Sequence, residues 1–549
     1  MEKRALIAVA ISIFILLFYQ EVVLRRFYPP PPEGETAVSA PPATAPVAPR
    51  SAPDIPPEIA APVRPQSEAR MVTVETDLYR AVFTSAGARL QNFQLKKYRT
   101  TVDPNSPLQQ MILPGREGDL PFGVELRGAQ GLSDSNAPYG VEGGDLRLTA
   151  GEEGSLNFAW AGDGVTLRKR FAFRGDRYDF SATVSAEGLA RQYNELAVAW
   201  AKGVATQPQP GSEVIFDHAI YLDGRKFTED PFDKLSAGKI VPEKDARADI
   251  QWSGYAGKHF LAAMVPVEAQ NERLWLKLRD STVEEKLLFP IPSDADAVQQ
   301  RLDIFIGPKD FDALERIGHN LSRGVNLGWF GFIAVPLLHV LQLSHTFTGN
   351  YGLDIILLTV IIKILFIPLT QRSFKSMRAM QKLQPQMAKI REKFKDTPEQ
   401  MNKEIMELYR RHKVNPLGGC LPMLLQIPVF IGLYQALLNT VELRHAPFFL
   451  WINDLSAPDR LGSIQFPVVQ HFLGPPGVPV LTLLMGVSMF VQQWMTPSAG
   501  DPAQQRVMMI MPVMFTFMFV TFPSGLVLYW LVNNLLTIAQ QFYMNRTST

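Results

Sequence analysis

Two hydrophobic patterns divide the chain, and the first one covers most of its N-terminal half. From about residue 71 to 318, the sequence alternates with a period of two between short Gly- and Asp-containing turns. The alternation is clearest in Leu167, Lys169, Phe171 and Phe173, and in Tyr178, Phe180, Ala182 and Val184. This period is typical of strands that bury one face, and it predicts a β-sandwich over residues 71–320. A carbohydrate or peptide site on the sandwich is the functional alternative, and no cluster of residues supports it.

The second pattern is a set of continuous apolar runs that approach or reach the length needed to cross a bilayer. The first run follows MEKR, and because no cleavage site follows it promptly, residues 1–24 are predicted to be an uncleaved anchor. Five later runs lie near residues 351–371, 417–440, 478–496, 507–522 and 524–541. The chain is therefore predicted to be a polytopic α-helical membrane protein with six spans. The last five spans form a core over residues 350–545.

Two segments join these parts. Residues 25–70 are predicted to be an extended linker, because thirteen prolines between residues 29 and 66 prevent regular structure. Residues 321–349 are predicted to be an interfacial amphipathic helix, because the apolar stretch is interrupted by Pro336 and by polar residues. His339 and His345 are six residues apart and do not share a helix face, so they are interpreted as surface histidines rather than metal ligands.

Residues 373–413 are predicted to form a cytoplasmic helical hairpin. Apolar residues step by three and four on both sides of the segment TPEQ, Thr397 to Gln400, which has the sequence of a capping box. The predicted seam consists of Met380, Leu383, Met387, Ile390 and Phe394, followed by Met401, Ile405, Leu408 and His412. Pro385 is expected to kink the first helix.

Charge determines the predicted topology. Residues 372–413 hold 12 Lys and Arg against 5 Asp and Glu, whereas residues 441–476 hold only Arg444 and Arg460 as basic residues. The positive-inside rule therefore puts the hairpin and both termini in the cytoplasm and the β-sandwich in the periplasm of a bacterium. The hairpin's basic faces are either solvated and in contact with anionic lipid, or in contact with ribosomal RNA.

Composition excludes several classes of function. The 54 basic and 53 acidic residues nearly balance, which argues against a DNA-binding protein. A single cysteine and eight histidines without ligand spacing make disulfide frameworks and multi-cysteine zinc sites improbable. The sequence contains no HExxH, Walker or GxSxG motif, so neither a cofactor nor an enzymatic activity is predicted.

The chemistry that stands out is a lysine inside a predicted span. Lys363 lies roughly 10 Å from the predicted cytoplasmic end of its span at Thr370, and a lysine at a span centre costs on the order of 3 kcal/mol. It shares one helix face with Thr359 and Thr370, so the face is predicted to meet protein or water. The last span carries a matching stripe of Tyr529, Asn533, Thr537 and Gln540.

Other spans add polar or adaptable side chains. The polar ones are Gln426, Tyr434, Ser488 and Gln492. Interhelical hydrogen bonding explains each uncharged residue taken alone, but it does not explain a set that includes Lys363. Fourteen of the 19 methionines lie between residues 377 and 518, which suits either an adaptable binding surface or ordinary filling of the core.

Three segments resemble the YidC/Oxa/Alb family of membrane protein insertases. They are VNPLGGCLPMLLQIPVFIGLYQAL (residues 414–437), VELRHAPFFLWINDLSAPD (441–459) and FPSGLVLYWLVNNLLTIAQQ (522–541). The resemblance covers about residues 350–543, whereas the N-terminal half is similar to the Gram-negative form only in layout. It implies insertion and folding of integral membrane proteins through a hydrophilic groove that is open to the cytoplasm and lipid and closed outside.

The resemblance also implies site residues and partners. The groove would be lined by Thr359, Lys363, Gln426, Pro428, Tyr529, Trp530 and Asn533. Lys363 stands where the family usually has arginine, which removes the planar fork for bidentate carboxylate binding. Trp530 stands where better-known Gram-negative forms have tyrosine. The implied partners are nascent clients, components of the Sec translocon, membrane lipids and, through the hairpin, the ribosome.

An ion-coupled transporter or channel that uses Lys363 is the competing interpretation. The sequence shows no inverted repeat and only one clear charge inside the spans, and a transporter has no need of the hairpin. Flux without a client would favour the transporter, whereas client insertion without flux would favour the insertase.

Overall fold

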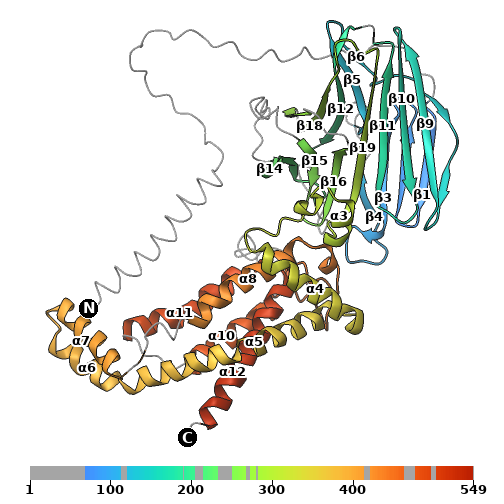
Figure 1. Cartoon of the computed structure of the whole chain (residues 1–549). Coiled ribbons are helices and arrows are strands. Elements are labelled where there is room, and N and C mark those ends of the chain that lie inside the picture. Colours follow the sequence, from blue (N-terminus) through green and yellow to red (C-terminus); the bar gives the residue numbers. More distant parts are fainter. Residues whose placement is uncertain are drawn as a thin grey trace, which may run out of the picture. The chain divides into compact units, whose positions relative to one another are not determined.

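Figure 1 shows the computed structural model of the chain. The described residues are 69–112, 120–189, 191–203, 214–224, 226–232, 250–267, 272–279, 282–412, 414, 421–462, 476–495 and 502–547. The predicted anchor, nearly all of the proline-rich linker and Cys420 lie outside these residues. The chain divides into two compact units with a boundary between Val325 and Asn326. The first is rich in β-structure, and the second is helical.

The β unit consists of three sheets. The first, in the order β4-β3-β2-β1-β8, contains β1 (Met71–Thr76), β2 (Tyr79–Thr84), β3 (Arg89–Arg99), β4 (Leu108–Ile112) and β8 (Leu146–Leu148). The second, in the order β14-β13-β15-β16-β19-β11-β10-β9-β7, contains β7 (Gly140–Glu142), β9 (Glu153–Gly162), β10 (Val165–Arg174), β11 (Asp179–Glu187), β13 (His218–Asp223), β14 (Lys226–Pro231), β15 (Ile250–Ala256), β16 (Phe260–Pro266) and β19 (Ala297–Pro308). The third, in the order β17-β18-β12-β5-β6, contains β5 (Gly123–Gly128), β6 (Leu132–Ser133), β12 (Tyr193–Gly203), β17 (Arg273–Arg279) and β18 (Thr282–Pro290). The short helices α3 (Phe311–Ile317) and η4 (Leu321–Gly324) end the unit.

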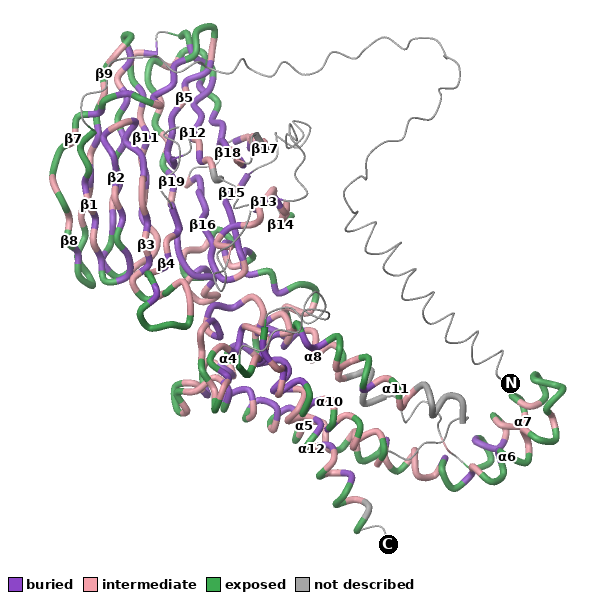
Figure 2. Tube along the Cα trace, turned by 180° about the vertical axis from the view of Figure 1, so that it is seen from behind, coloured by how far each residue is buried: buried purple, intermediate pink, exposed green. Residues whose placement is uncertain are grey.

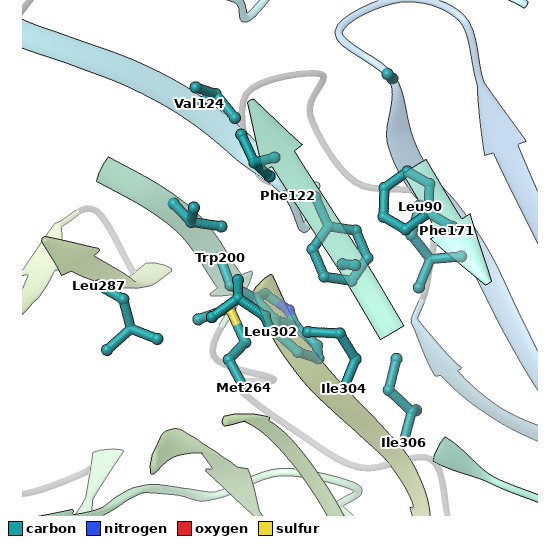
Figure 3. Packing of buried hydrophobic residues seen from close by; sticks show 14 of the residues in the cluster. Leu90, Phe122, Val124, Phe171, Trp200, Met264, Leu287, Leu302, Ile304 and Ile306 are labelled. Atoms are coloured by element: carbon teal, nitrogen blue, oxygen red, sulfur yellow. The ribbon is translucent and has the colours of Figure 1, made fainter. Parts of the chain in front are cut away.

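The alternating positions seen in the sequence face the core of this unit. Along β10, Val165, Leu167, Lys169, Phe171 and Phe173 are buried, while most of the intervening residues are exposed. Side chains from all three sheets meet in one cluster, part of which is shown in Figure 3. The ring of Phe171, for example, lies 5.2 Å from that of Phe122 and 4.7 Å from that of Phe83. Burial of these rings is the main source of stability of the unit.

The helical unit contains eight α-helices among the described residues. They are α4 (Gly331–Thr348), α5 (Tyr351–Lys382), α6 (Gln384–Lys393), α7 (Pro398–Arg411), α8 (Leu421–Asn439), α10 (Val480–Met495), α11 (Pro502–Phe519) and α12 (Ser524–Thr547), with the 3-10 turn η6 (Val441–Leu443) after α8. Within the described part of the chain, one helix, α5, is long and apolar enough to cross a membrane. The apolar helix α10 and the apolar part of α11 are shorter.

The helix α5 is longer than the span expected from the sequence. It does not end near residue 371 but continues to Lys382, through Pro368. Its 32 residues correspond to a length of about 48 Å, well beyond a hydrocarbon core of about 30 Å. The polar C-terminal turns of α5 therefore lead directly into the hairpin.

The hairpin α6–α7 differs from the prediction at both of its turns. Pro385 does not kink a helix but lies in the first turn of α6, where its missing N–H would have no partner anyway. Thr397 precedes α7, but its side chain makes no capping hydrogen bond, so the expected capping box does not form. An apolar cluster joins the two helices and the end of α5, and it includes Met380, Leu383, Met387, Leu408 and Tyr409.

The helix α4 begins at Gly331, ten residues later than the predicted interfacial helix, and it continues through Pro336. Its buried face, with Leu338 and Leu341, packs toward α8 and α5. The opposite face is green in Figure 2 and exposes Phe332, Leu343 and Phe347. Apolar side chains therefore lie on both the buried and the exposed face of α4.

The remaining helices form a bundle in which α12 packs against both α5 and α10, as both views show (Figures 1 and 2). The helices α10 and α11 approach each other closely at Gly486, where a Cβ atom would lie 2.2 Å from the Thr516 hydroxyl oxygen. The core of the bundle includes Ile355, Leu433, Met485, Phe519 and Tyr529. This packing brings the polar faces of α5 and α12 together.

Candidate functional site

Two hydrogen bonds connect the polar stripes of α5 and α12. The ammonium group of Lys363 donates to Thr537 Oγ1 at 2.6 Å. The amide of Gln540 donates to Thr370 Oγ1 at 2.9 Å. The i to i+4 and i to i+11 spacings put each set on one face of its helix, and the packing of α12 on α5 places those faces opposite each other.

The environment of Lys363 is polar but uncharged. Its side chain is half-buried, and no carboxylate of a described residue lies within 4.0 Å of its ammonium nitrogen. Thr537 is 9% exposed and donates its own hydroxyl hydrogen to Asn533 O at 2.6 Å. The threonine oxygen therefore has only lone pairs to offer the lysine, which matches a donor that has no acceptor capacity.

Two of the predicted groove residues take part in this arrangement only indirectly. Thr359 is 1% exposed, and its hydroxyl donates to Ile355 O in its own helix at 2.6 Å. Asn533 contributes its backbone carbonyl, which accepts the Thr537 hydroxyl. Thr359 therefore shares the helix face of Lys363, but among the described residues it forms no bond to α12.

An aromatic cluster lies N-terminal to this polar pair on α12. Tyr529 is 1% exposed and belongs to the bundle core, so it is not an open groove residue. Trp530 is half-buried, with its ring 4.9 Å from that of Phe430 on α8 and perpendicular to it. The Gln426 amide lies beside the Tyr529 hydroxyl, but their geometry falls short of a hydrogen bond. Gln426 and Phe430, about one helical turn apart on α8, thus face α12 at this level.

Pro428 lies within α8 and is half-buried, between Gln426 and the aromatic contact at Phe430. Because proline has no N–H, the carbonyl four residues earlier loses its helical partner. The structure thus brings Gln426, Pro428, Tyr529 and Trp530 to the α8–α12 contact. Lys363 and Asn533 lie at the α5–α12 contact instead.

The sequence analysis placed Thr537 and Gln540 in a polar stripe but not among the groove residues. The structure makes them the direct partners of Lys363 and Thr370. A further bond joins α12 to α10, where Asn534 donates to Ser488 Oγ at 3.0 Å. The spacing of eight residues from Tyr529 to Thr537 was the available signal, but spacing alone does not specify which helix lies opposite.

The end of the bundle opposite to the hairpin is tied together by the loop after η6. Asp459 accepts the N–H of Leu481 at 2.7 Å and the hydroxyl of Thr482 at 2.9 Å, and so caps α10. Arg460 donates to Val520 O at 3.1 Å, just beyond the end of α11. A carboxylate at a helix N-terminus and a cation at a helix C-terminus both complement the helix dipoles.

The same loop also fastens the first turns of α12 and α5. The hydroxyl of Ser524 donates to Asp454 O at 2.8 Å. The ring of Phe448 fills the space beside Gly352, where an added Cβ would lie 2.0 Å from a ring carbon. Residues 448–460 of this loop thus contact four helices at this end.

A polar corner lies where α4 turns into α5. Asp354 is fully buried and accepts from His345 Nδ1 at 2.8 Å and from Thr348 Oγ1 at 2.6 Å. The interpretation of His345 as a surface histidine is therefore wrong, because the turn at Gly349 returns the chain onto this carboxylate. Among the described residues, no three His, Cys, Asp or Glu side chains form a cluster that could hold a metal ion.

Comparison with known proteins identifies both units. The family described as 60Kd inner membrane protein matches residues 343–549, and the YidC periplasmic domain matches residues 71–340. A membrane protein insertase YidC of Pelobacter propionicus is 41% identical over 572 residues, which cover 100% of this chain and 99% of the relative. That of Syntrophobacter fumaroxidans is 41% identical over 560 residues, with both chains covered completely.

This chain also matches the crystal structure of an active YidC insertase with its first transmembrane domain resolved. The match covers 88% of this chain and 93% of the insertase chain. The sequence identity is 21% and the TM-score is 0.36. The full-length matches at 41% identity and the two family matches concern both the β unit and the helical bundle that carries Lys363. This chain belongs to the YidC family of membrane protein insertases.

Proposed function

We propose that this chain inserts client proteins into the bacterial inner membrane, and that Lys363 is the charge that attracts acidic client segments. The single observation that carries the proposal is the half-buried ammonium group of Lys363, which has a neutral hydroxyl as its partner. It lies on α5, which is long and apolar enough to cross a membrane. A cation in such a position attracts carboxylates more strongly than a surface lysine does.

The surrounding residues would complete the groove. The hydroxyl and amide groups of α5 and α12 would replace part of the water that a hydrophilic client segment loses, which lowers its desolvation cost. Thr359, Gln426, Pro428, Tyr529, Trp530 and Asn533 remain the proposed groove residues, with Trp530 forming the groove wall at α8 and the buried Tyr529 supporting that wall from the bundle core. Transfer of the client's apolar helix into lipid would then drive its release.

The topology follows from the same proposal. The chain would cross the membrane six times with both termini in the cytoplasm, the β unit in the periplasm and the hairpin in the cytoplasm. The loop with Asp454 and Asp459 would then close the periplasmic end of the groove. Lipids, the Sec translocon and, through the basic hairpin, the ribosome are the proposed partners.

The test uses the full chain reconstituted in vesicles and a series of small clients that differ only in the number of acidic residues in the translocated segment. Lys363→Arg should insert all of them, because it retains the charge. Lys363→Ala should insert neutral clients in part and should lose activity as the client becomes more acidic. Lys363→Glu should be the weakest for the most acidic client, with a loss of roughly tenfold or more for one like-charge contact.

Lys97→Glu is the control, because Lys97 is an exposed lysine on β3, in the β unit and outside the proposed groove and the hairpin. It should insert the client series as the parent does. If Lys363→Glu and the parent insert every client equally, Lys363 has no electrostatic role and is a packing residue. Ion flux through vesicles that contain no client would instead support a transporter.

A further inference from the structure

We propose that Thr537 is a positioning residue for Lys363 and that its hydroxyl determines how strongly the groove prefers acidic clients. The inference rests on the proposed function, because it concerns the same charge. It adds a residue on the opposite helix whose chemical requirement is a hydroxyl group. The argument depends on the direction of two hydrogen bonds and on the distance from Lys363 to the hydroxyl of Thr370.

The orientation of the Thr537 hydroxyl is determined by its own helix. Its hydrogen points to Asn533 O, four residues earlier, at 2.6 Å. Its oxygen lone pairs therefore face away from that carbonyl, and the Lys363 ammonium group lies 2.6 Å away on α5. Because the threonine is 9% exposed, water has little access to replace it as the acceptor.

Thr370, in the next polar pair along the groove, does not offer the lysine an equivalent position. Thr370 donates its hydroxyl hydrogen to Phe366 O at 3.0 Å and accepts from the Gln540 amide at 2.9 Å. It lies seven residues from Lys363, which is about 10 Å along the helix. An ammonium group released from Thr537 would therefore extend toward the hairpin end of α5, as lysines do when they reach for water.

The consequence concerns specificity. The bond to Thr537 uses one of the three ammonium hydrogens and leaves the others available to a client carboxylate. A neutral partner holds the ammonium group in place without neutralising its charge, in contrast to a carboxylate partner. Thr537 thus fixes the depth at which an acidic client segment meets the positive charge.

The experiment compares Thr537→Val and Thr537→Ser in the reconstituted full chain with the same client series. Valine has nearly the shape of threonine but lacks the hydroxyl, and serine retains it. Thr537→Val should lower insertion of the most acidic client about tenfold, the factor expected for a bond to a charged group, and should leave the neutral client within about twofold. Thr537→Ser should restore insertion of the acidic client.

A second measurement separates positioning from packing. In a Lys363→Ala background, Thr537→Val should cause no further change, because the group it positions is missing. Thr516→Val is the matched control, because its hydroxyl also donates to the carbonyl four residues earlier, at Pro512, and lies on α11 away from Lys363. It should leave the dependence on client charge unchanged.

The outcomes distinguish this inference from the function on which it rests. An equal loss for neutral and acidic clients, or an additional loss in the Lys363→Ala background, would show that Thr537 only packs. If Lys363→Ala is sensitive to client charge while Thr537→Val behaves like the parent, the inference fails and the proposed function stands. If Lys363→Ala shows no sensitivity to client charge, the proposed role of Lys363 in attracting acidic clients fails, and this inference fails with it.

Discussion

Two lysines, one in each unit of the protein, have different hydrogen-bond partners. Lys169 in the β unit is fully buried, and its ammonium group lies 2.6 Å from a carboxylate oxygen of Asp134. It also donates to the backbone carbonyls of Gly87 and Phe122, each at 2.6 Å. Lys363 in the helical unit is half-buried and bonds to a neutral hydroxyl.

The partner of Lys169 is itself well satisfied. Asp134 accepts the Tyr139 hydroxyl at 2.9 Å and the Val124 N–H at 2.8 Å, and it forms an ion pair with Arg89 at 3.5 Å. Each of the three ammonium hydrogens of Lys169 has an acceptor, so this lysine has no unused hydrogen-bond donor for another molecule. It binds the turn at Gly87 and the residue that precedes β5, Phe122, to the core of the sheets.

The difference between a carboxylate partner and a neutral hydroxyl partner separates a lysine with a structural role from one that is available for function. A buried ion with a complete set of partners holds elements together, and breaking that set leaves an uncompensated charge. A charge with a single neutral partner stabilises the fold little and keeps its attraction for a ligand. The two lysines therefore differ both in burial and in the charge of the partner, and it is the charge of the partner that decides whether the lysine can attract a ligand.

The largest effect on stability is expected when Lys169 loses its ion pair and its two hydrogen bonds in the β unit. Lys169→Met leaves Asp134 buried beside Arg89 alone at a longer distance, and the free energy of unfolding of the β unit should fall by about 3–5 kcal/mol. Proteolysis of the full chain in detergent over a urea series, following the β unit, measures this change.

Arg168→Met is the control for that measurement, because Arg168 is the exposed neighbour on the same strand, with a surface ion pair to Glu187. It should alter the unfolding free energy by less than about 1 kcal/mol. A similarly small effect of Lys169→Met would mean that the buried pair contributes no more than a surface pair and would remove the contrast with Lys363.

A smaller effect is expected at a second buried charge in the β unit, Glu285. Burial raises the pKa of Glu285 to about 8, and the Ser253 hydroxyl that donates to it only partly opposes this rise. The folded state keeps a proton that the unfolded state releases above pH 4.5. The contribution of Glu285 to the free energy of unfolding is therefore fully present below about pH 4.5 and is lost as the pH rises through about 8.

Between pH 6 and pH 8 this loss amounts to about 2 kcal/mol, which follows from the two pKa values by linkage. Glu285→Gln retains the shape without the titration, so its unfolding free energy should lack this part of the pH dependence. The difference between parent and variant in urea midpoints at pH 6 and pH 8 provides the test. Equal pH slopes would show that Glu285 does not hold a proton in the folded state.

The smallest effect on stability is expected at Lys363. Lys363→Met removes a charge and keeps the length of the side chain, and the Thr537 hydroxyl keeps its bond to Asn533 O. The helical unit should therefore unfold within about 1 kcal/mol of the parent, or with slightly greater stability. Thermal unfolding of the full chain in detergent, followed by helix content, measures it. A loss comparable to that of Lys169→Met would indicate that Lys363 is a structural charge.

Several features of the molecule were determined by the sequence alone. The alternation around Lys169 and Phe171 established a β-rich unit, because one face of each strand has to be buried whatever its neighbours are. The apolar run around Lys363 established a helix, and the stripes on α5 and α12 established which face of each helix is polar. These features depend on residues close together in the chain.

Tertiary structure decided which of these faces meet and which charges are satisfied. Lys363 and Thr537 are 174 residues apart in the sequence. Lys169 and Gly87, whose carbonyl it binds, are 82 residues apart. The pairing of His345 with Asp354 depends on a turn at Gly349, and the cap of α10 comes from Asp459, outside that helix. Periodicity specifies the direction of a side chain from its own helix or strand, but its partner depends on how the elements pack. The two lysines therefore look alike in the sequence and differ in the folded protein.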